Sequence, residues 1–287
     1  MADTGGRFGA VVLTVITRSE RLAHMAEQEI EGHPRRRFLQ QAAVGGAVAG
    51  AMWVTPQVLS TVPAFAVGTA CTTSSAVNWT SFAQFTPGKA TLTSGWNLGT
   101  FGGTAVNFLM ADPAGRLIYG PGGTYPQYDT GVQPTTHDVG FTGFFSMLMN
   151  NAALSDTATL TITFSRKVKT LAFTIIDLTI GAGTTGYIDQ VVLTAYNNYN
   201  NVGGTQTTVP ITATPVTANV TVTTAGNVVT ATGTVAPCGA NCTNNNLGVS
   251  IAGPLDALVI NYKQAKNVTS ANGTYQYVGL TNLGWAC

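Results

Sequence analysis

Polar and apolar residues alternate along most of the chain from Ser74 onward. Residues 157–164, with the sequence TATLTITF, show the pattern most clearly, because every second side chain is apolar. A period of two places these side chains on one face of a half-buried strand. Similar short stretches are separated by Gly, Pro and Asn, which favour turns. The predicted strands are 76–82, 90–96, 104–110, 139–148, 157–164, 168–176, 187–196, 217–224, 227–235, 247–252, 255–262 and 275–285.

About a dozen short strands with turn residues between them are typical of an antiparallel sandwich or barrel, so the chain is predicted to be all-β. Two stretches, 164–173 and 251–260, share one arrangement: a strand, a tight turn and a second strand with alternating apolar side chains. The turns are predicted at 165–167 and at 253–254. We interpret the two stretches as two hairpins packed in related sheets, because no further copy is present.

The order of elements in the C-terminal half resembles that of jelly-roll modules of bacterial surface and extracellular proteins. The resemblance covers about residues 158–285. It implies a jelly-roll-like antiparallel β-sandwich for this part of the chain. The positions that carry it are Phe173 to Asp177, Asp189 to Val191, Pro254 to Tyr262 and Gly279 to Trp285.

A cluster of arginines precedes the strand-rich part of the chain. Arg35 and Arg36 are followed by one spacer residue and then by Phe38 and Leu39, and an uncharged stretch runs from Phe38 to residue 88. The arrangement resembles the twin-arginine export signal of bacteria. It implies passage through the twin-arginine translocase to a secreted, extracellular or cell-surface location.

The uncharged stretch contains Ala64-Phe65-Ala66, a small-x-small site of the kind that signal peptidase cleaves. Cleavage there divides the chain into an export signal, 1–66, and a single β-sandwich domain, 67–287. Met25 begins a more ordinary leader and is a candidate for the true start. Glycines and prolines interrupt the stretch before it reaches the roughly twenty apolar residues that a span requires, so no permanent membrane span is expected.

The part after residue 66 has an unusual composition: 40 Thr, 19 Asn, no Glu, seven basic residues and seven Asp. A domain with so few charges, which sum to zero, has no general attraction to nucleic acid or to an anionic membrane. Without charge repulsion, its surface tolerates close contact with neutral molecules. Neutral glycans and other copies of the chain are therefore the expected partners.

Four cysteines lie in this part: Cys71, Cys238, Cys242 and Cys287. In an exported chain they are expected to form two disulfides, for which three pairings exist. We favour Cys238–Cys242, across a short loop, and Cys71–Cys287, because the termini of compact domains are often close together. A metal site at Cys238 and Cys242 is the alternative, but His137 is the sole imidazole after residue 66.

Asp177 and Asp189 flank a glycine-rich loop, across which they could approach each other. Carboxylates and loop carbonyls together are ligands for calcium, so these two residues are the candidate metal site. They are also the candidate acids of a polysaccharide hydrolase, since glycoside cleavage usually requires a pair of carboxyl groups. The alternative is that both are turn residues bonded to nearby backbone amides. No other cofactor is expected, because no cofactor-binding motif is present.

Tyr119, Tyr125 and Tyr128 lie in one glycine- and proline-rich stretch and are the candidate binding residues, because exposed rings can stack on sugars. The alternative is that they pack over the end of the core. With no catalytic residue assigned, the sequence favours a non-enzymatic extracellular surface or binding module. It would be a self-associating or envelope-attached structural protein, or a glycan binder; a polysaccharide hydrolase that uses Asp177 and Asp189 is the rival.

Overall fold

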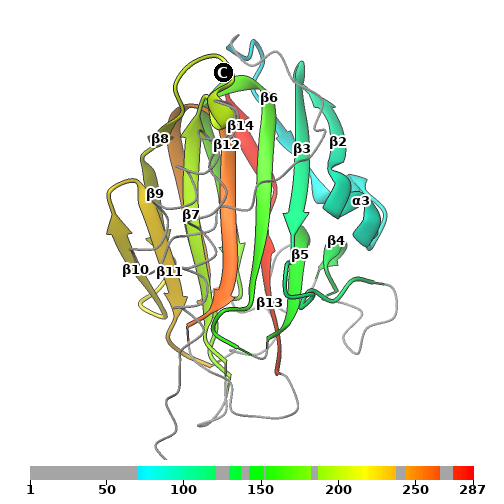
Figure 1. Ribbon diagram of the computed structural model, residues 1–287, viewed down its shortest axis with the longest axis vertical. Coiled ribbons are helices and arrows are strands. Elements are labelled where there is room, and N and C mark those ends of the chain that lie inside the picture. The colour runs from blue at the N-terminus through cyan, green and yellow to red at the C-terminus, as the bar shows by residue number, and fades with distance from the viewer. Residues whose placement is uncertain are drawn as a thin grey trace, which may run out of the picture. The chain divides into compact units, whose positions relative to one another are not determined.

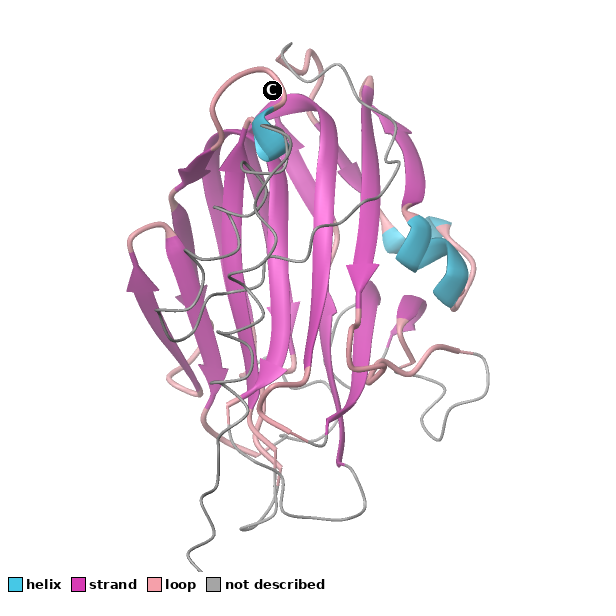
Figure 2. Cartoon of the chain, viewed as in Figure 1, coloured by secondary structure: helices cyan, strands magenta, loops and turns pink. Residues whose placement is uncertain are grey.

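The computed structural model describes residues 70–120, 129–136, 142–151, 153–181, 187–236, 244–265 and 274–287. They belong to the second of two compact units, residues 59–287; the first unit, 1–58, lies outside the described residues. Antiparallel strands dominate and helices are few and short, which confirms the all-β prediction (Figure 2). Within the described ranges no helix is long and apolar enough to cross a membrane. The predicted export signal and its cleavage site lie outside these ranges.

Most of the described strands are short, and two of them, β6 and β12, are long. The strands are β1 (Ser75–Val77), β2 (Trp96–Phe101), β3 (Thr104–Ala111), β4 (Gly131–Thr136), β5 (Thr142–Asn151), β6 (Thr157–Ile176), β7 (Asp189–Asn197), β8 (Thr207–Val209), β9 (Ile211–Pro215), β10 (Val220–Ala225), β11 (Val228–Gly233), β12 (Leu247–Gln264), β13 (Thr274–Leu280) and β14 (Leu283–Ala286). The helices are η1 (Trp79–Ser81), α3 (Lys89–Ser94) and η2 (Tyr199–Asn201).

Two predicted strands are partly helical. Residues 90–94 lie in α3 rather than in a strand, and the following strand starts only at Trp96. Residues 79–81 form η1, because the Asn78 side chain accepts a hydrogen bond from the Thr80 amide, at 3.1 Å, and caps this turn. A period-two pattern over so few residues does not separate a strand from one turn of helix.

The strands form two antiparallel layers that share β6 and β12, giving a sandwich-like fold (Figure 1). In one layer the order is β2, β3, the first part of β6, the last part of β12, β7, β11 and β10. In the other, β13 and β14 follow one another along the last part of β6, whose opposite side pairs with the first part of β12 and then β9. β5 and β4 extend this layer beside β13, and β1 lies beside β14.

The prediction of two hairpins is wrong. Each stretch is the middle of one continuous strand, and the two strands pair with each other: Ile251 lies opposite Leu171, and Leu258 opposite Ile162. The supposed turns are the place where both strands pass from one layer to the other. The pairing register shifts on each side of Leu255, and the buried positions change from odd to even in β12 and from even to odd in β6. A β-bulge explains this, because an extra residue bends the strand and reverses its alternation.

Gly253 lies at this bend for a steric reason. A Cβ at this position would clash with the Val168 carbonyl oxygen of the partner strand. A glycine permits this close approach of two backbones, which a larger residue would prevent. The glycine and proline of the supposed turn thus mark the bulge between the layers.

Aromatic rings fill one part of the interior. Trp79, Trp96, Phe108 and Phe145 are buried. Each tryptophan contacts both phenylalanines and the phenylalanines contact each other, with ring centroids 5.2–6.5 Å apart and several edge-to-face contacts. The β5 stretch around Phe145 is therefore core.

The two ends of the folded unit are joined. Cys71 and Cys287 form a disulfide, with Cα atoms 5.1 Å apart and a sequence separation of 216, which confirms the predicted pairing. β1 and β14 hold the two ends beside each other, since Ser75 lies opposite Trp285 in their ladder. The predicted Cys238–Cys242 pair lies outside the described residues.

Removing the terminal disulfide should lower stability strongly. In the chain-entropy model, a crosslink that closes a loop this long stabilises the folded state by about 5 kcal/mol. We expect the Cys71→Ala/Cys287→Ala variant to lose most of that amount in urea unfolding, with a lower midpoint. When both proteins are measured under a reducing agent, the difference should shrink to the small effect of the side chains. Equal midpoints without the reducing agent would contradict this role.

Candidate functional site

A buried carboxyl group lies at one end of the sandwich. Asp189, the first residue of β7, is 0% exposed and lies opposite Gln264, the last residue of β12. The Tyr262 hydroxyl donates to Asp189 Oδ1 at 2.7 Å. The Thr179 amide and hydroxyl donate to Asp189 Oδ2 at 3.1 and 3.0 Å. The protein itself therefore supplies hydrogen bonds to both oxygens.

The surroundings favour the neutral acid at this position. Burial raises the pKa of Asp189 well above its ordinary value, and the charge of nearby Asp177 raises it further; the hydrogen bonds from Tyr262 and Thr179 oppose the shift. Burial also raises the pKa of Tyr262 and of Tyr187, and Asp189 adds to both shifts. These residues form what we call the Asp189 cluster: Thr179, Tyr187, Asp189 and Tyr262.

Asp177 follows directly on β6 and has left-handed backbone geometry, with φ 63°. Its amide donates to the Asn246 side chain at 3.1 Å. Asp tolerates this geometry better than most residues, which accounts for an acidic residue at a strand end. The structure thus brings Asp177 and Asp189 close enough to interact electrostatically, as the sequence suggested.

Asp177 and Asp189 are the residues predicted to hold calcium or to act as a hydrolytic pair. Across the described ranges, no group of three or more acidic, His or Cys side chains is placed to hold a metal ion. The calcium site at Asp177 and Asp189 stays a prediction, and Asp189 offers it no unbonded oxygen. As a hydrolytic acid, Asp189 would need to reach a polymer, but its side chain is fully enclosed.

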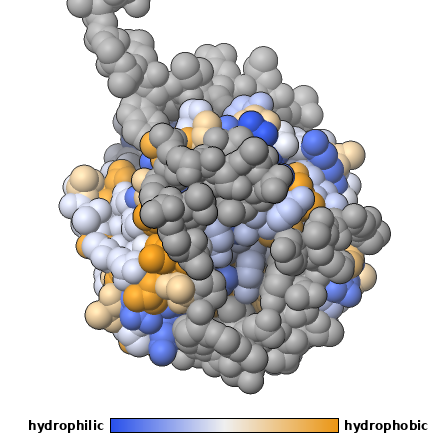
Figure 3. Space-filling model, turned by 90° about the horizontal axis from the view of Figure 1, so that it is seen from below, coloured by the Kyte–Doolittle hydropathy of each residue, from blue (hydrophilic) through white to orange (hydrophobic). Residues whose placement is uncertain are grey.

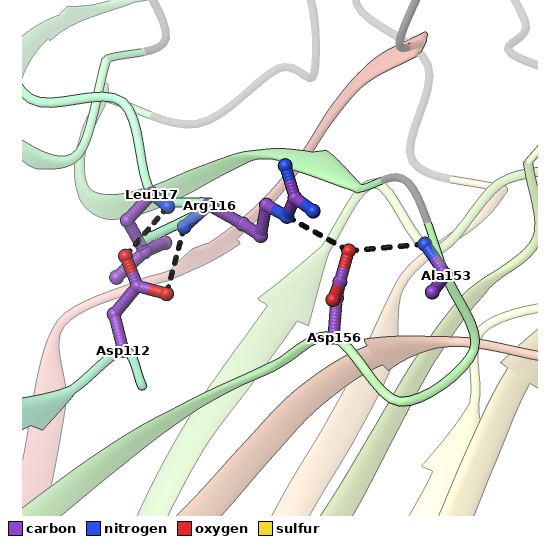
Figure 4. A network of polar contacts seen from close by, with 5 residues as sticks. All are labelled: Asp112, Arg116, Leu117, Ala153 and Asp156. Atoms are coloured by element: carbon purple, nitrogen blue, oxygen red, sulfur yellow. Dashed lines mark hydrogen bonds and ion pairs between the residues drawn. The ribbon is translucent and has the colours of Figure 1, made fainter. Parts of the chain in front are cut away.

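The second candidate region is the stem of the tyrosine-containing stretch. Asp112 accepts the amides of Arg116 and Leu117, each at 2.8 Å, and so closes the turn after β3 (Figure 4). The Arg116 Nε lies 2.9 Å from Asp156 Oδ2, which also accepts the Ala153 amide at 3.0 Å. This network ties the stem to the turn that precedes β6, so the segment leading to Tyr119 is fixed at its base.

Tyr119 is half-buried and packs against the core. The Lys89 ammonium lies 5.6 Å from its ring centroid, in cation–π range, and occupies one face of the ring. Burial, and secondarily the charge of Asp112, raises the pKa of its hydroxyl above the ordinary range. The Tyr119 ring therefore packs against the core and against Lys89, which leaves little of it available to stack on a sugar. Tyr125 and Tyr128 lie outside the described residues, so a tyrosine-lined binding site stays a prediction.

The tryptophans after residue 66 are not stacking platforms. Trp79, Trp96 and Trp285 are each at most 8% exposed and belong to the hydrophobic core.

Sequence reasoning missed two buried amides, one of which, that of Gln264, lies opposite Asp189. The side chains of Gln264 and Gln276 are each 1% exposed, and no partner within the described structure bonds their amide atoms. The sequence does mark them, because each is a polar residue at a position where the alternation places a buried apolar side chain. Gln264 lies on the same inward face of its strand as Tyr262, and Gln276 on the same inward face as Val278. Such positions mark a polar end to an otherwise apolar interior.

No family model matches this chain, and neither a curated protein nor a solved structure matches it. Its function must therefore be argued from its own residues.

The raised pKa of Asp189 predicts a specific pH dependence of stability. The folded state keeps a proton that the unfolded state releases above its pKa of about 3.9. The stabilisation is full below that pH and is lost as the pH rises through the raised folded-state pKa. We expect the free energy of unfolding of wild type minus that of Asp189→Asn to fall with pH, by up to about 1.4 kcal/mol per pH unit within this window.

Urea unfolding at several pH values between 4 and 8 measures this difference. Tyr262→Phe is the matched control, because it removes a hydrogen bond that lowers the Asp189 pKa. When Tyr262→Phe is present in both proteins, the difference in unfolding free energy caused by Asp189→Asn should keep falling to higher pH. A wild-type minus Asp189→Asn difference that is flat over this range would show that Asp189 is ionised inside the fold.

Proposed function

We propose that this chain is an exported, non-enzymatic surface module, a self-associating structural protein built on a jelly-roll-type sandwich. The observation that carries the proposal is the disulfide between Cys71 and Cys287, which closes the folded unit end to end. Disulfides of this structural kind persist in oxidising compartments outside the cytosol. The twin-arginine-like segment at Arg35 and Arg36 points to the same destination.

The surface supports association with neutral partners. The exposed faces of β8, β9 and β10 carry threonines and no charged residue. Seen from below, much of the visible coloured surface is pale, and the strongly hydrophilic residues form separate groups (Figure 3). A surface without like-charge repulsion allows copies to approach closely, which a charged surface would oppose.

The interior supports a non-enzymatic role over the rival hydrolase. A hydrolytic pair needs contact with the scissile bond, whereas Asp189 is enclosed and bonded on both oxygens. These hydrogen bonds explain the presence of Asp189 by a structural role in the interior, without a catalytic one. Glycan binding through the tyrosine stretch is the competing binding role, and the experiment below includes it.

The test is to express the full chain in a bacterium that has the twin-arginine route and to follow the protein outside the cytoplasm. We expect wild type in the medium or surface fraction, oxidised at Cys71 and Cys287, and larger than a monomer by light scattering without added ligand. The same material is incubated with a polysaccharide panel, and retention and released reducing sugar are measured. Neither retention nor release is expected.

The control variants separate destination from activity. Arg35→Lys/Arg36→Lys should keep the protein in the cell, whereas Arg37→Lys, at the spacer position, should be exported. Cytoplasmic wild type, or an exported protein that stays monomeric, would contradict the proposal. Retention lost in Tyr125→Ala would assign glycan binding instead, and sugar release abolished by Asp189→Asn would assign the hydrolase.

A further inference from the structure

One edge of the sandwich lacks the usual protection against pairing. β10 lies at the free end of its layer: it pairs with β11 on one side and with no strand on the other, among the described residues (Figure 1). Its six residues, VTVTTA, include no charge, proline or glycine. The ladder with β11 runs from Val220 to Ala225 without a register shift, so the edge is regular. An edge of this kind is a template for another strand.

The hairpin geometry shows which backbone groups face outward. Gly226 and Asn227 form a two-residue turn, and Ala225 lies opposite Val228. In such a hairpin the closing pair exchanges hydrogen bonds, and the next pair does not. The Thr234 amide donates to the Asn219 carbonyl at 2.9 Å, in the same alternation. The odd-numbered residues of β10 therefore bond to β11, and the N–H and C=O groups of the even-numbered ones point to the free edge.

The other edges are protected. β4 contains Pro134 and an irregular register after Gln133. β2 has a register shift before Gly99. β1 and β8 have three residues each, and β9 ends in Pro215. Prolines, bulges and short lengths are the features that keep natural edge strands from pairing. Within the described structure, β10 alone has none of them.

We propose that β10 pairs with β10 of a second copy of this chain, in antiparallel orientation around a two-fold axis at Val222. This inference rests on the self-association in the proposed function and names its contact. With Val222 of one copy opposite Val222 of the other, Val220 of each copy lies opposite Thr224 of the other. The backbone groups of these residues are the ones that point to the free edge. Every outward N–H and C=O of the strand then gains a partner. The layer that contains β10 in one copy and the same layer of the second copy join into one continuous sheet.

The side chains suit a second copy better than an unrelated strand. Val222 is half-buried and packs on the edge of the core, so two copies would complete each other's burial on the inner face. On the outer face, Thr221 and Thr223 are exposed, and this register places Thr221 of one copy opposite Thr223 of the other. Cross-strand threonine pairs are favourable, and no charge opposes the contact.

The experiment uses charge pairs in the full-length protein, with sedimentation equilibrium as the measurement. Thr221→Lys/Thr223→Lys places lysine opposite lysine in both outer pairs, so the dissociation constant should rise at least about tenfold. Thr221→Lys/Thr223→Glu places lysine opposite glutamate in the same register and should restore wild-type association. Thr224→Pro, which removes an outward N–H and leaves the bonds to β11, should also weaken the dimer.

The matched control is Thr212→Lys/Thr214→Lys on β9, where two exposed threonines have the same spacing on an edge strand; association should be unchanged. Far-ultraviolet spectra and urea midpoints check that every variant folds. If wild type associates and the lysine pair on β10 has no effect, the β10 contact is wrong while self-association stands. If wild type is monomeric at millimolar concentration, both are wrong.

Discussion

The pairing of β6 with β12 is the constraint on which the rest of the structure depends. These two strands run side by side through both layers, and each has a bend where the buried face changes from one set of positions to the other. Every other layer member is attached to one of them directly or through one or two neighbours. Because their contacts join residues about 90 positions apart, this pairing fixes the topology at a high cost in loop-closure entropy.

The functional features follow from where these strands begin and end. The end of β12 and the turn after β6 bring Tyr262 and Thr179 to Asp189, so the polar end of the interior is a consequence of the pairing. Near the bend, the Cys71 amide donates to the Lys167 carbonyl of β6 at 2.9 Å, and β14 lies along the same strand. The disulfide therefore closes a frame that is already in register, and β10 remains at the far edge, where nothing in the pairing covers it.

Local pattern predicted the parts of this fold that depend on neighbouring residues. Alternation located most strands, including β7 and β11, and the cysteine positions at the two ends predicted the disulfide. It failed where a residue has two local meanings: Gly253 and Pro254 suit a tight turn and a bulge equally well, and a distant strand decides between them. The closeness of Asp177 and Asp189 was predictable, because the two residues flank one glycine-rich loop. The enclosure of Asp189 by Tyr262 was not, because 73 residues separate them in sequence.

Native-state hydrogen exchange tests the central claim, that β6 and β12 hold both layers as one cooperative unit. Amides of β6 on the two sides of the bend, at Leu160 to Ile162 and at Thr170 to Ala172, have strand partners on both sides in different layers. We predict that both sets exchange only through global unfolding, with the same free energy and the same dependence on denaturant. Two sets that exchange with clearly different free energies would show that the layers open independently, as two separate hairpins would, and would contradict the account.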